Sequence, residues 1–330
     1  MKQLNVIALA LIATVSVCGL TACTEDGPAS ESPYMTESAL TEGYMTCEEA
    51  PAPEALAVKP IAAEGHTALY APAHDPVGLI VLLGDEGEGA EAWFEGSSRA
   101  QMMQDAHDRG FGLLALDRTS HQAGSYQVDL HGALDALSEL GAIDADTPMF
   151  GIGYGAGGDY LTALTRSVDF DAIMVANATG IDAIVQRDAL PPTWFATATH
   201  DAIDRAQLGA NIEGLRANGV TVRTSENVPT AIKPATLTQS FGVDCALAQD
   251  IVRGLVAHQL LNADGTLAED PSHGAWIKAI ADSAQLDPSN ATDRVVIDAL
   301  ARQMRELYAD GAFSANHSGF VLTFFADNLR

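Results

Sequence analysis

Short, continuous apolar runs alternate along the chain with longer segments in which apolar residues recur every three or four positions. A run of the first kind is typical of a buried parallel strand, and the wider spacing is typical of a helix packed on one side. The pattern predicts strands at residues 67–70, 77–83, 112–116, 149–152, 170–176, 193–199 and 220–225, and helices at 98–109, 128–140 and 203–217. This alternation predicts an α/β fold with a doubly wound, mostly parallel sheet.

Residues 234–310 lack strand character. Helical spacing recurs within them at 243–261, 272–284 and 291–309. We expect this segment to be a helical insertion that packs like a lid over the carboxyl edge of the sheet. The core, which begins at residue 61 and runs to 233, then resumes at 311–330 with a loop that carries His317 and a final helix.

The first 22 residues combine one lysine with a mostly apolar run, which indicates a secretory signal peptide rather than a transmembrane span. Their end, Leu20-Thr21-Ala22-Cys23, resembles a bacterial lipobox, which implies cleavage before Cys23 and a lipid anchor on that residue. A plain signal peptide cut near Cys23 is the alternative. Because Thr24 and not Asp follows, the resemblance implies the outer membrane of a Gram-negative cell envelope. Residues 23–60 are rich in Ser, Thr, Pro, Ala and acid, and predict a flexible acidic tether.

The formal net charge of −27 constrains the partners. Removing the signal peptide removes Lys2 and no acid, which leaves 16 basic residues against 44 acidic ones, a charge of −28. Such a surface repels nucleic acid and anionic membranes, so we expect no nucleic-acid partner. The membrane is expected to be reached through the lipid anchor alone.

A glycine cluster follows the apolar run 149–152 and precedes a helix-like pattern, which predicts a strand that turns sharply into a helix. The five positions from Gly153 to Gly157 match the G-x-S-x-G turn of serine hydrolases, except that Gly155 stands where the serine should be. The chain therefore resembles the α/β-hydrolase family, specifically esterases whose turn reads G-x-S-A-G-G. The resemblance implies an α/β-hydrolase core over residues 67–225 and at the C-terminus, with its nucleophile missing.

Two other interpretations of the same turn stay open. Gly153, Gly155 and Gly158 also fit the G-x-G-x-x-G pattern of dinucleotide-binding proteins. That pattern needs an acid at the end of the next strand, whereas Asp169 and Asp171 lie at its beginning. A tight glycine turn without any chemical role is the simpler alternative.

The loop 84–89 reads Gly-Asp-Glu-Gly-Glu-Gly. In the related esterases a backbone N–H of this loop and the N–H after the nucleophile form the oxyanion hole, so the resemblance assigns these roles to Asp85 and Ala156. Three carboxylates beside a developing oxyanion would oppose catalysis. They could instead bind a divalent cation, but a solvated acidic loop is favoured. We predict no metal and no cofactor.

The resemblance also implies a carboxylate and a histidine, in that chain order, after the nucleophile. Asp201, with Asp204 as second choice, follows the predicted strand 193–199, and His317 precedes the final helix. Asp201 could instead be a helix N-cap, and His317 a surface histidine. The nearby hydroxyls of Tyr154, Ser97 and Ser98 do not lie at the apex of the turn.

Cysteine usage predicts one disulfide. Cys18 leaves with the signal peptide and Cys23 carries lipid, so Cys47 and Cys245 remain in an oxidising compartment. We expect them to form a bond that joins the N-terminal arm to the hydrolase body. Two free, distant thiols are the alternative.

These features favour a lipid-anchored hydrolase fold that has lost its nucleophile and binds an acyl, peptide or glycan-like ligand or an envelope protein. An active esterase or lipase-like enzyme that uses water or a substitute nucleophile is the first alternative. A nucleotide-binding protein and a purely structural envelope protein are the others.

Overall fold

The computed structural model describes residues 32–47, 55–63, 66–95, 97–117, 125–186 and 190–329. Within them, Pro33 begins a single compact unit. The predicted signal peptide and Cys23 lie outside the described residues. No helix in the described part of the chain is long and apolar enough to cross a membrane.

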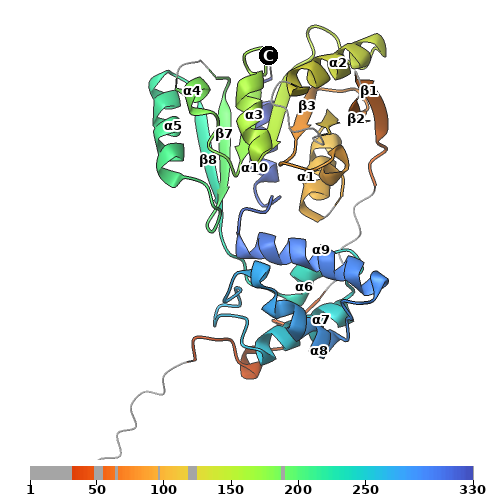
Figure 1. Ribbon diagram of the computed structural model, residues 1–330, viewed down its shortest axis with the longest axis vertical. Coiled ribbons are helices and arrows are strands. Elements are labelled where there is room, and N and C mark those ends of the chain that lie inside the picture. Colours follow the sequence, from red (N-terminus) through yellow and green to blue (C-terminus); the bar gives the residue numbers. More distant parts are fainter. Residues whose placement is uncertain are drawn as a thin grey trace, which may run out of the picture. The chain divides into compact units, whose positions relative to one another are not determined.

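Eight strands form one sheet in the order β1-β2-β4-β3-β5-β6-β7-β8 (Figure 1). The pairs β1·β2 and β2·β4 are antiparallel, and the remaining pairs are parallel. This confirms the predicted doubly wound, mostly parallel sheet. The strands are β1 (Lys59–Ala63), β2 (His66–Ala71), β3 (Gly78–Leu83), β4 (Phe111–Leu116), β5 (Met149–Tyr154), β6 (Ala172–Ala176), β7 (Thr193–Ala198) and β8 (Val222–Asn227).

The strand at the first edge of the sheet was missed by the sequence analysis. The pattern predicted that residues 67–70 form an edge strand, but β2 pairs on both sides because β1 lies outside it. β1 reads Lys-Pro-Ile-Ala-Ala, and only Ile61 is a large apolar residue. An edge strand buries less of its surface than a central strand does, so fewer of its residues need to be apolar. Its sequence is therefore harder to recognise as a strand.

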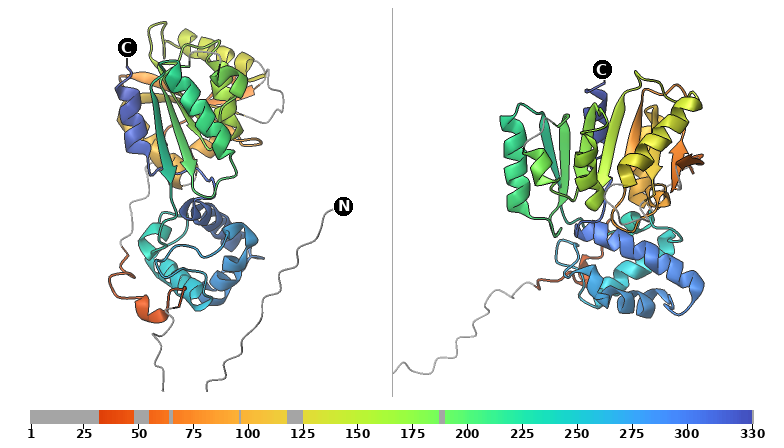
Figure 2. Two further views of the ribbon diagram at one scale, coloured as in Figure 1. Left: turned by 90° about the vertical axis from the view of Figure 1, so that its left-hand side faces the viewer. Right: turned by 45° about the horizontal axis from the view of Figure 1, so that its top comes forward.

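Helices cover both faces of the sheet (Figure 2). Strand β3 shows how the pleat divides the core, because Leu79, Val81 and Leu83 belong to one apolar cluster while Ile80 and Leu82 belong to the other. The first cluster includes residues of α2 (Ser125–Glu139), α3 (Ala156–Leu164), α4 (Asp182–Val185) and α5 (Arg205–Ala217), and the second includes residues of α1 (Ser97–Asp108), η2 (Ala90–Trp93) and α10 (Ser318–Ala326).

The predicted insertion is helical and has its own apolar core. Trp276, Leu255 and Leu300 are among its most buried side chains. Its elements are α6 (Pro234–Leu237), α7 (Cys245–Ala257), η3 (Pro271–His273), α8 (Ala275–Ala284) and α9 (Ala291–Tyr308).

Residues 32–47 of the predicted tether are packed rather than flexible. Met35 is 6% exposed and belongs to the apolar core of the insertion, and the Tyr44 hydroxyl donates to the Ile232 carbonyl at 2.5 Å. Cys47 and Cys245 form the predicted disulfide. Cys245 is the first residue of α7, so the bond joins the arm to the insertion and not to the hydrolase body as we expected. Most residues of the arm are polar, and Met35 and Tyr44 are among its few large apolar ones. Their burial keeps the arm against the insertion.

Candidate functional site

The sharp turn predicted after the apolar run 149–152 is present. Strand β5 ends at Tyr154, helix α3 begins at Ala156, and Gly155 between them has φ 56° and ψ −131°. Residues with a side chain rarely adopt this backbone conformation, whereas glycine tolerates it. The Gly155 N–H donates to the Ala176 carbonyl at 2.9 Å, so the turn is tied to the neighbouring strand.

The other glycines of the turn allow α3 to pack closely against the sheet. A Cβ on Gly153 would lie 2.5 Å from the Gly157 carbonyl oxygen, and a Cβ on Gly157 would lie 2.7 Å from the carbonyl carbon of Leu83. Close packing thus accounts for the glycine spacing without a nucleotide. The turn also follows the fifth strand of the chain, whereas the dinucleotide pattern follows the first. We therefore do not retain nucleotide binding as a proposal.

The Asp85 carboxylate occupies the space next to Gly155. A Cβ on Gly155 would lie 2.5 Å from Asp85 Cγ and 3.0 Å from its Oδ2. Asp85 Oδ1 accepts a hydrogen bond from the Ala156 N–H at 2.9 Å. The carboxylate therefore fills the position from which a nucleophilic side chain would extend.

A second carboxylate occupies the other N–H group assigned to the oxyanion hole. The Asp85 N–H donates to Glu88 Oε2 at 2.9 Å. Arg99 binds both oxygens of Glu88, with Nη1 to Oε2 and Nη2 to Oε1 each at 2.9 Å. The guanidinium of Arg99 lies 4.6 Å from the ring centre of Tyr154 and 5.1 Å from that of Trp93. Both predicted oxyanion donors are thus bound to side chains of this chain.

The acidic loop is therefore only partly a solvated loop. Glu86 is exposed, but Asp85 and Glu88 are half-buried and hydrogen-bonded to backbone N–H groups. Among the described residues, no group of three or more His, Cys, Asp or Glu side chains is arranged to hold a metal ion.

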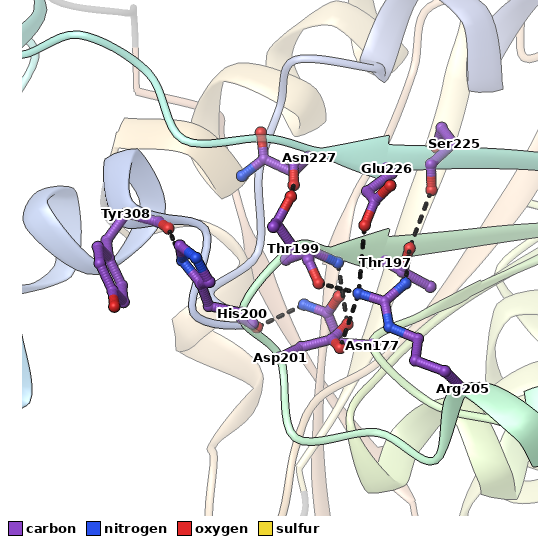
Figure 3. A network of polar contacts seen from close by, with 12 residues as sticks. Asn177, Thr197, Thr199, His200, Asp201, Arg205, Ser225, Glu226, Asn227 and Tyr308 are labelled. Atoms are coloured by element: carbon purple, nitrogen blue, oxygen red, sulfur yellow. Dashed lines mark hydrogen bonds and ion pairs between the residues drawn. The ribbon is translucent and has the colours of Figure 1, made fainter. Parts of the chain in front are cut away.

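Asp201 lies just after β7, where the resemblance places the catalytic carboxylate, but its oxygens have other partners (Figure 3). Its side chain is 2% exposed, Oδ1 forms an ion pair with Arg205 Nη2 at 3.1 Å, and Oδ2 accepts from the Ala198 N–H at 2.9 Å. The same Arg205 nitrogen lies 3.4 Å from Glu226 Oε1. Asp204, the second choice, is the N-cap of α5 and accepts from two backbone N–H groups of its first turn.

His317 precedes the first residue of α10, as predicted. Its Nε2 atom is buried and has no hydrogen-bond partner in the described part of the chain. The ring lines a cavity of about 10 Å³ together with Asn177, Thr197 and Asn227, which is room for about one water molecule. No hydrogen bond joins it to Asp201 within the described residues. Its role as a base remains a prediction.

The sequence analysis missed a buried carboxyl group, Glu306, near the end of α9. It accepts hydrogen bonds from the hydroxyls of Ser98 and Ser314 and from the Ala315 backbone. Burial raises the pKa of Glu306 from its ordinary value of 4.5 to about 7, although these hydrogen bonds oppose the shift. The sequence offered no signal for this group, because its surroundings include Ser98 and Ser314, which other segments of the chain supply.

The hydroxyls near the turn are engaged as well. Ser98 is bonded to Glu306, and the Tyr154 hydroxyl donates to the Gly311 carbonyl at 2.9 Å. Burial raises the pKa of Tyr154, although the nearby Arg99 opposes that shift. The side chain of Ser97 lies outside the described residues.

Comparison with known proteins finds similar chains only among solved structures. No family model matches the sequence, and no curated protein matches it. Among solved structures, an esterase of Pyrococcus furiosus is 9% identical, with 52% of this chain and 82% of that chain covered and a TM-score of 0.43. A carboxyl esterase of Bacillus coagulans is 10% identical, with 53% and 90% covered and a TM-score of 0.41. Est1E of Butyrivibrio proteoclasticus is 10% identical, with 52% and 89% covered and a TM-score of 0.42.

These TM-scores are low, so the assignment rests on the chain's own elements. The mostly parallel sheet has helices on both faces, and a sharp strand-to-helix turn follows the fifth strand. The loop after β3 reaches that turn through Asp85. Since this is the arrangement of strand, turn and loop in α/β hydrolases, the chain has a fold of the α/β-hydrolase type.

Proposed function

We propose that this α/β-hydrolase-fold protein has lost its serine nucleophile and acts by binding a ligand. The observation that carries the proposal is the position of the Asp85 carboxylate, which fills the side-chain space at Gly155 and binds the Ala156 N–H. A serine hydrolase needs that space for its nucleophile and that N–H for the oxyanion of the tetrahedral intermediate. Here both are used within the chain.

The surroundings support the same conclusion. Glu88 occupies the second N–H donor, and the two carboxylates place negative charge where the oxyanion would develop. Removing a single oxyanion donor costs about 10²- to 10³-fold in kcat in enzymes of this kind. Asp201 is paired with Arg205, and no hydrogen bond joins it to His317 among the described residues.

Hydrolysis of p-nitrophenyl butyrate and labelling by a fluorophosphonate test the proposal. The parent chain should give neither, and Gly155→Ser alone should stay silent because Asp85 occupies the space of the new side chain. Gly155→Ser combined with Asp85→Ala vacates that space and one N–H donor. We expect the fluorophosphonate to label this double variant, and we expect the label to be lost when His317→Ala is added. Ester hydrolysis by the parent that His317→Ala abolishes would show that the nucleophile has been replaced rather than lost.

One observation favours the alternative of an active hydrolase with a substitute nucleophile. The Ser98 hydroxyl is hydrogen-bonded to Glu306, a buried carboxyl group whose pKa is raised to about 7. A hydroxyl bonded to a carboxylate with a pKa near neutrality is an arrangement of nucleophile and general base. In that case the parent would hydrolyse the ester, and Ser98→Ala would abolish the activity whereas Gly155→Ala would not.

We also propose that the chain is anchored in the bacterial cell envelope through lipid on Cys23. The sequence Leu20-Thr21-Ala22-Cys23 and the disulfide between Cys47 and Cys245, which suits an oxidising compartment, support this location. Labelling of cells with radioactive palmitate tests it. The label should enter the parent chain and not Cys23→Ser, and equal labelling of both would contradict the anchor.

A further inference from the structure

Arg99, with three aromatic rings around it, holds the carboxylate of Glu88. The guanidinium holds both Glu88 oxygens at 2.9 Å, and the Arg99 side chain is only 11% exposed. Two-point binding of this kind matches the planar carboxylate group in geometry and charge. The bound carboxylate belongs to the chain itself.

The site has apolar walls beside its polar contacts. The ring of Tyr154 lies 4.6 Å from the Arg99 guanidinium, that of Trp93 5.1 Å and that of Phe313 5.8 Å. Cation–π contacts hold the guanidinium in place while its N–H groups point at the carboxylate. A few placed polar groups among aromatic side chains are typical of small-molecule sites.

Glu88 lies on a short, glycine-rich polar loop. Loop 84–89 contains glycine at every second or third position, and Gly87 has φ 79°. No large apolar side chain lies between Gly84 and Gly89, so polar contacts and not packing keep Glu88 in the site. A competing carboxylate can replace polar contacts of this kind, because each contributes only modestly to stability.

The same loop carries a second carboxylate. Asp85 accepts a hydrogen bond from the Ala156 N–H, while Glu88 binds Arg99. Displacement of the loop would free both Arg99 and the Ala156 N–H from these carboxylates.

We propose that loop 84–89 is an internal stand-in for the ligand, and that the site beneath it binds a small organic carboxylate with an apolar tail. This inference rests on the proposed binding function and names the ligand class. The carboxylate would be held by Arg99 and the tail by Trp93, Tyr154 and Phe313.

Calorimetric titration of the full chain in detergent with sodium hexanoate, at constant ionic strength, tests the inference. The variant Glu88→Gln keeps the shape of the loop but weakens its hold on Arg99, and should bind hexanoate about tenfold more tightly than the parent. Glu86→Gln is the matched control, because it removes the same charge from an exposed position of the same loop. Asp85→Asn added to Glu88→Gln should tighten binding further.

Two comparisons make the result specific. Hexanamide, which has the same tail without the charge, should not bind. In the Glu88→Gln background, Arg99→Lys keeps the positive charge but loses the two-point geometry, and should weaken hexanoate binding at least tenfold. The inference is overturned if Glu88→Gln binds no more tightly than Glu86→Gln, if hexanamide binds equally well, or if Arg99→Lys has no effect in a folded protein. Since the proposed function is tested separately by ester hydrolysis, the two can fail independently.

Discussion

Asp85 and Gly155 are spatially complementary: the Asp85 carboxylate lies where any side chain at position 155 would begin, with 2.5 Å between its Cγ and the Cβ position. The two residues are 70 positions apart and come from different loops at the carboxyl edge of the sheet. A glycine at the turn is therefore favoured twice, once by its φ of 56° and once by the side chain beside it.

The first prediction concerns this pair. Gly155→Ala should lower the free energy of unfolding by about 2–4 kcal/mol, because it adds backbone strain and displaces Asp85. In an Asp85→Ala background the overlap is gone, and the same substitution should cost only about 1–2 kcal/mol. Urea denaturation of the four proteins measures the coupling.

A control separates this effect from the general effect of replacing glycine. Gly209 lies inside α5 and has open space around its Cβ position, so Gly209→Ala should stabilise the protein by about 0.5–1 kcal/mol. Equal costs for Gly155→Ala with and without Asp85 would contradict the spatial relationship.

The second prediction concerns pH. The pKa of Glu306 is about 7 in the folded protein and 4.5 as its ordinary value, so between these pH values the folded state holds a proton that the unfolded state has released. The stabilisation is complete below pH 4.5, falls as the pH rises, and is lost above pH 7. Its size is on the order of 3 kcal/mol. Glu306→Gln should remove this pH dependence.

Denaturation midpoints measured from pH 4.5 to 8 check this prediction. Glu213, an exposed residue of α5, provides the matched control, because Glu213→Gln removes the same charge without a buried partner. The difference in denaturation midpoint between the parent and Glu306→Gln should change across this pH range. The difference in midpoint between the parent and Glu213→Gln should stay nearly constant. A flat difference for Glu306→Gln would show that the group is ionised throughout.

The third prediction concerns the disulfide. Cys47 and Cys245 are separated by 198 residues, and a bond closing so long a segment restricts the unfolded chain strongly. Replacing both by serine should cost about 2–5 kcal/mol of stability. Because Cys245 begins α7, hydrogen exchange should increase first in the insertion and in residues 32–47.

Reductant supplies the internal control for the disulfide. It should lower the melting temperature of the parent and leave that of the Cys47→Ser/Cys245→Ser variant unchanged. Faster exchange in the sheet, with the insertion unaffected, would argue against the attachment of the arm to the insertion.

The fourth prediction concerns the ion pair beside the turn. Arg99→Met leaves the carboxylate of Glu88, which is 30% exposed, without its bidentate partner. Fully buried pairs broken in this way cost about 3–5 kcal/mol, and partial exposure should reduce the loss to about 2 kcal/mol. The exposed pair of Arg253 and Asp250 is the control, since Arg253→Met should cost less than about 1 kcal/mol. If urea denaturation gives equal losses of unfolding free energy for Arg99→Met and Arg253→Met, burial does not strengthen the Arg99–Glu88 pair.

The sequence by itself determined the parts of this protein that depend on neighbouring residues. The continuous apolar runs of β3 and β4 indicated buried strands, and the glycines from 153 to 158 indicated a tight strand-to-helix turn. Helical spacing revealed the insertion, and cysteine usage gave the disulfide partners. Each signal is local or follows from counting, so no knowledge of distant neighbours was needed.

Tertiary structure decided which side chains meet. Whether Asp85 lies over Gly155 or in solvent, and whether Asp201 binds Arg205 or a histidine, depends on how loops from different strands are brought together. The raised pKa of Glu306 likewise requires burial against Ser98, 208 positions away in the chain. Composition and spacing do not encode such contacts, because desolvation and hydrogen bonding depend on the surroundings that the folded chain creates.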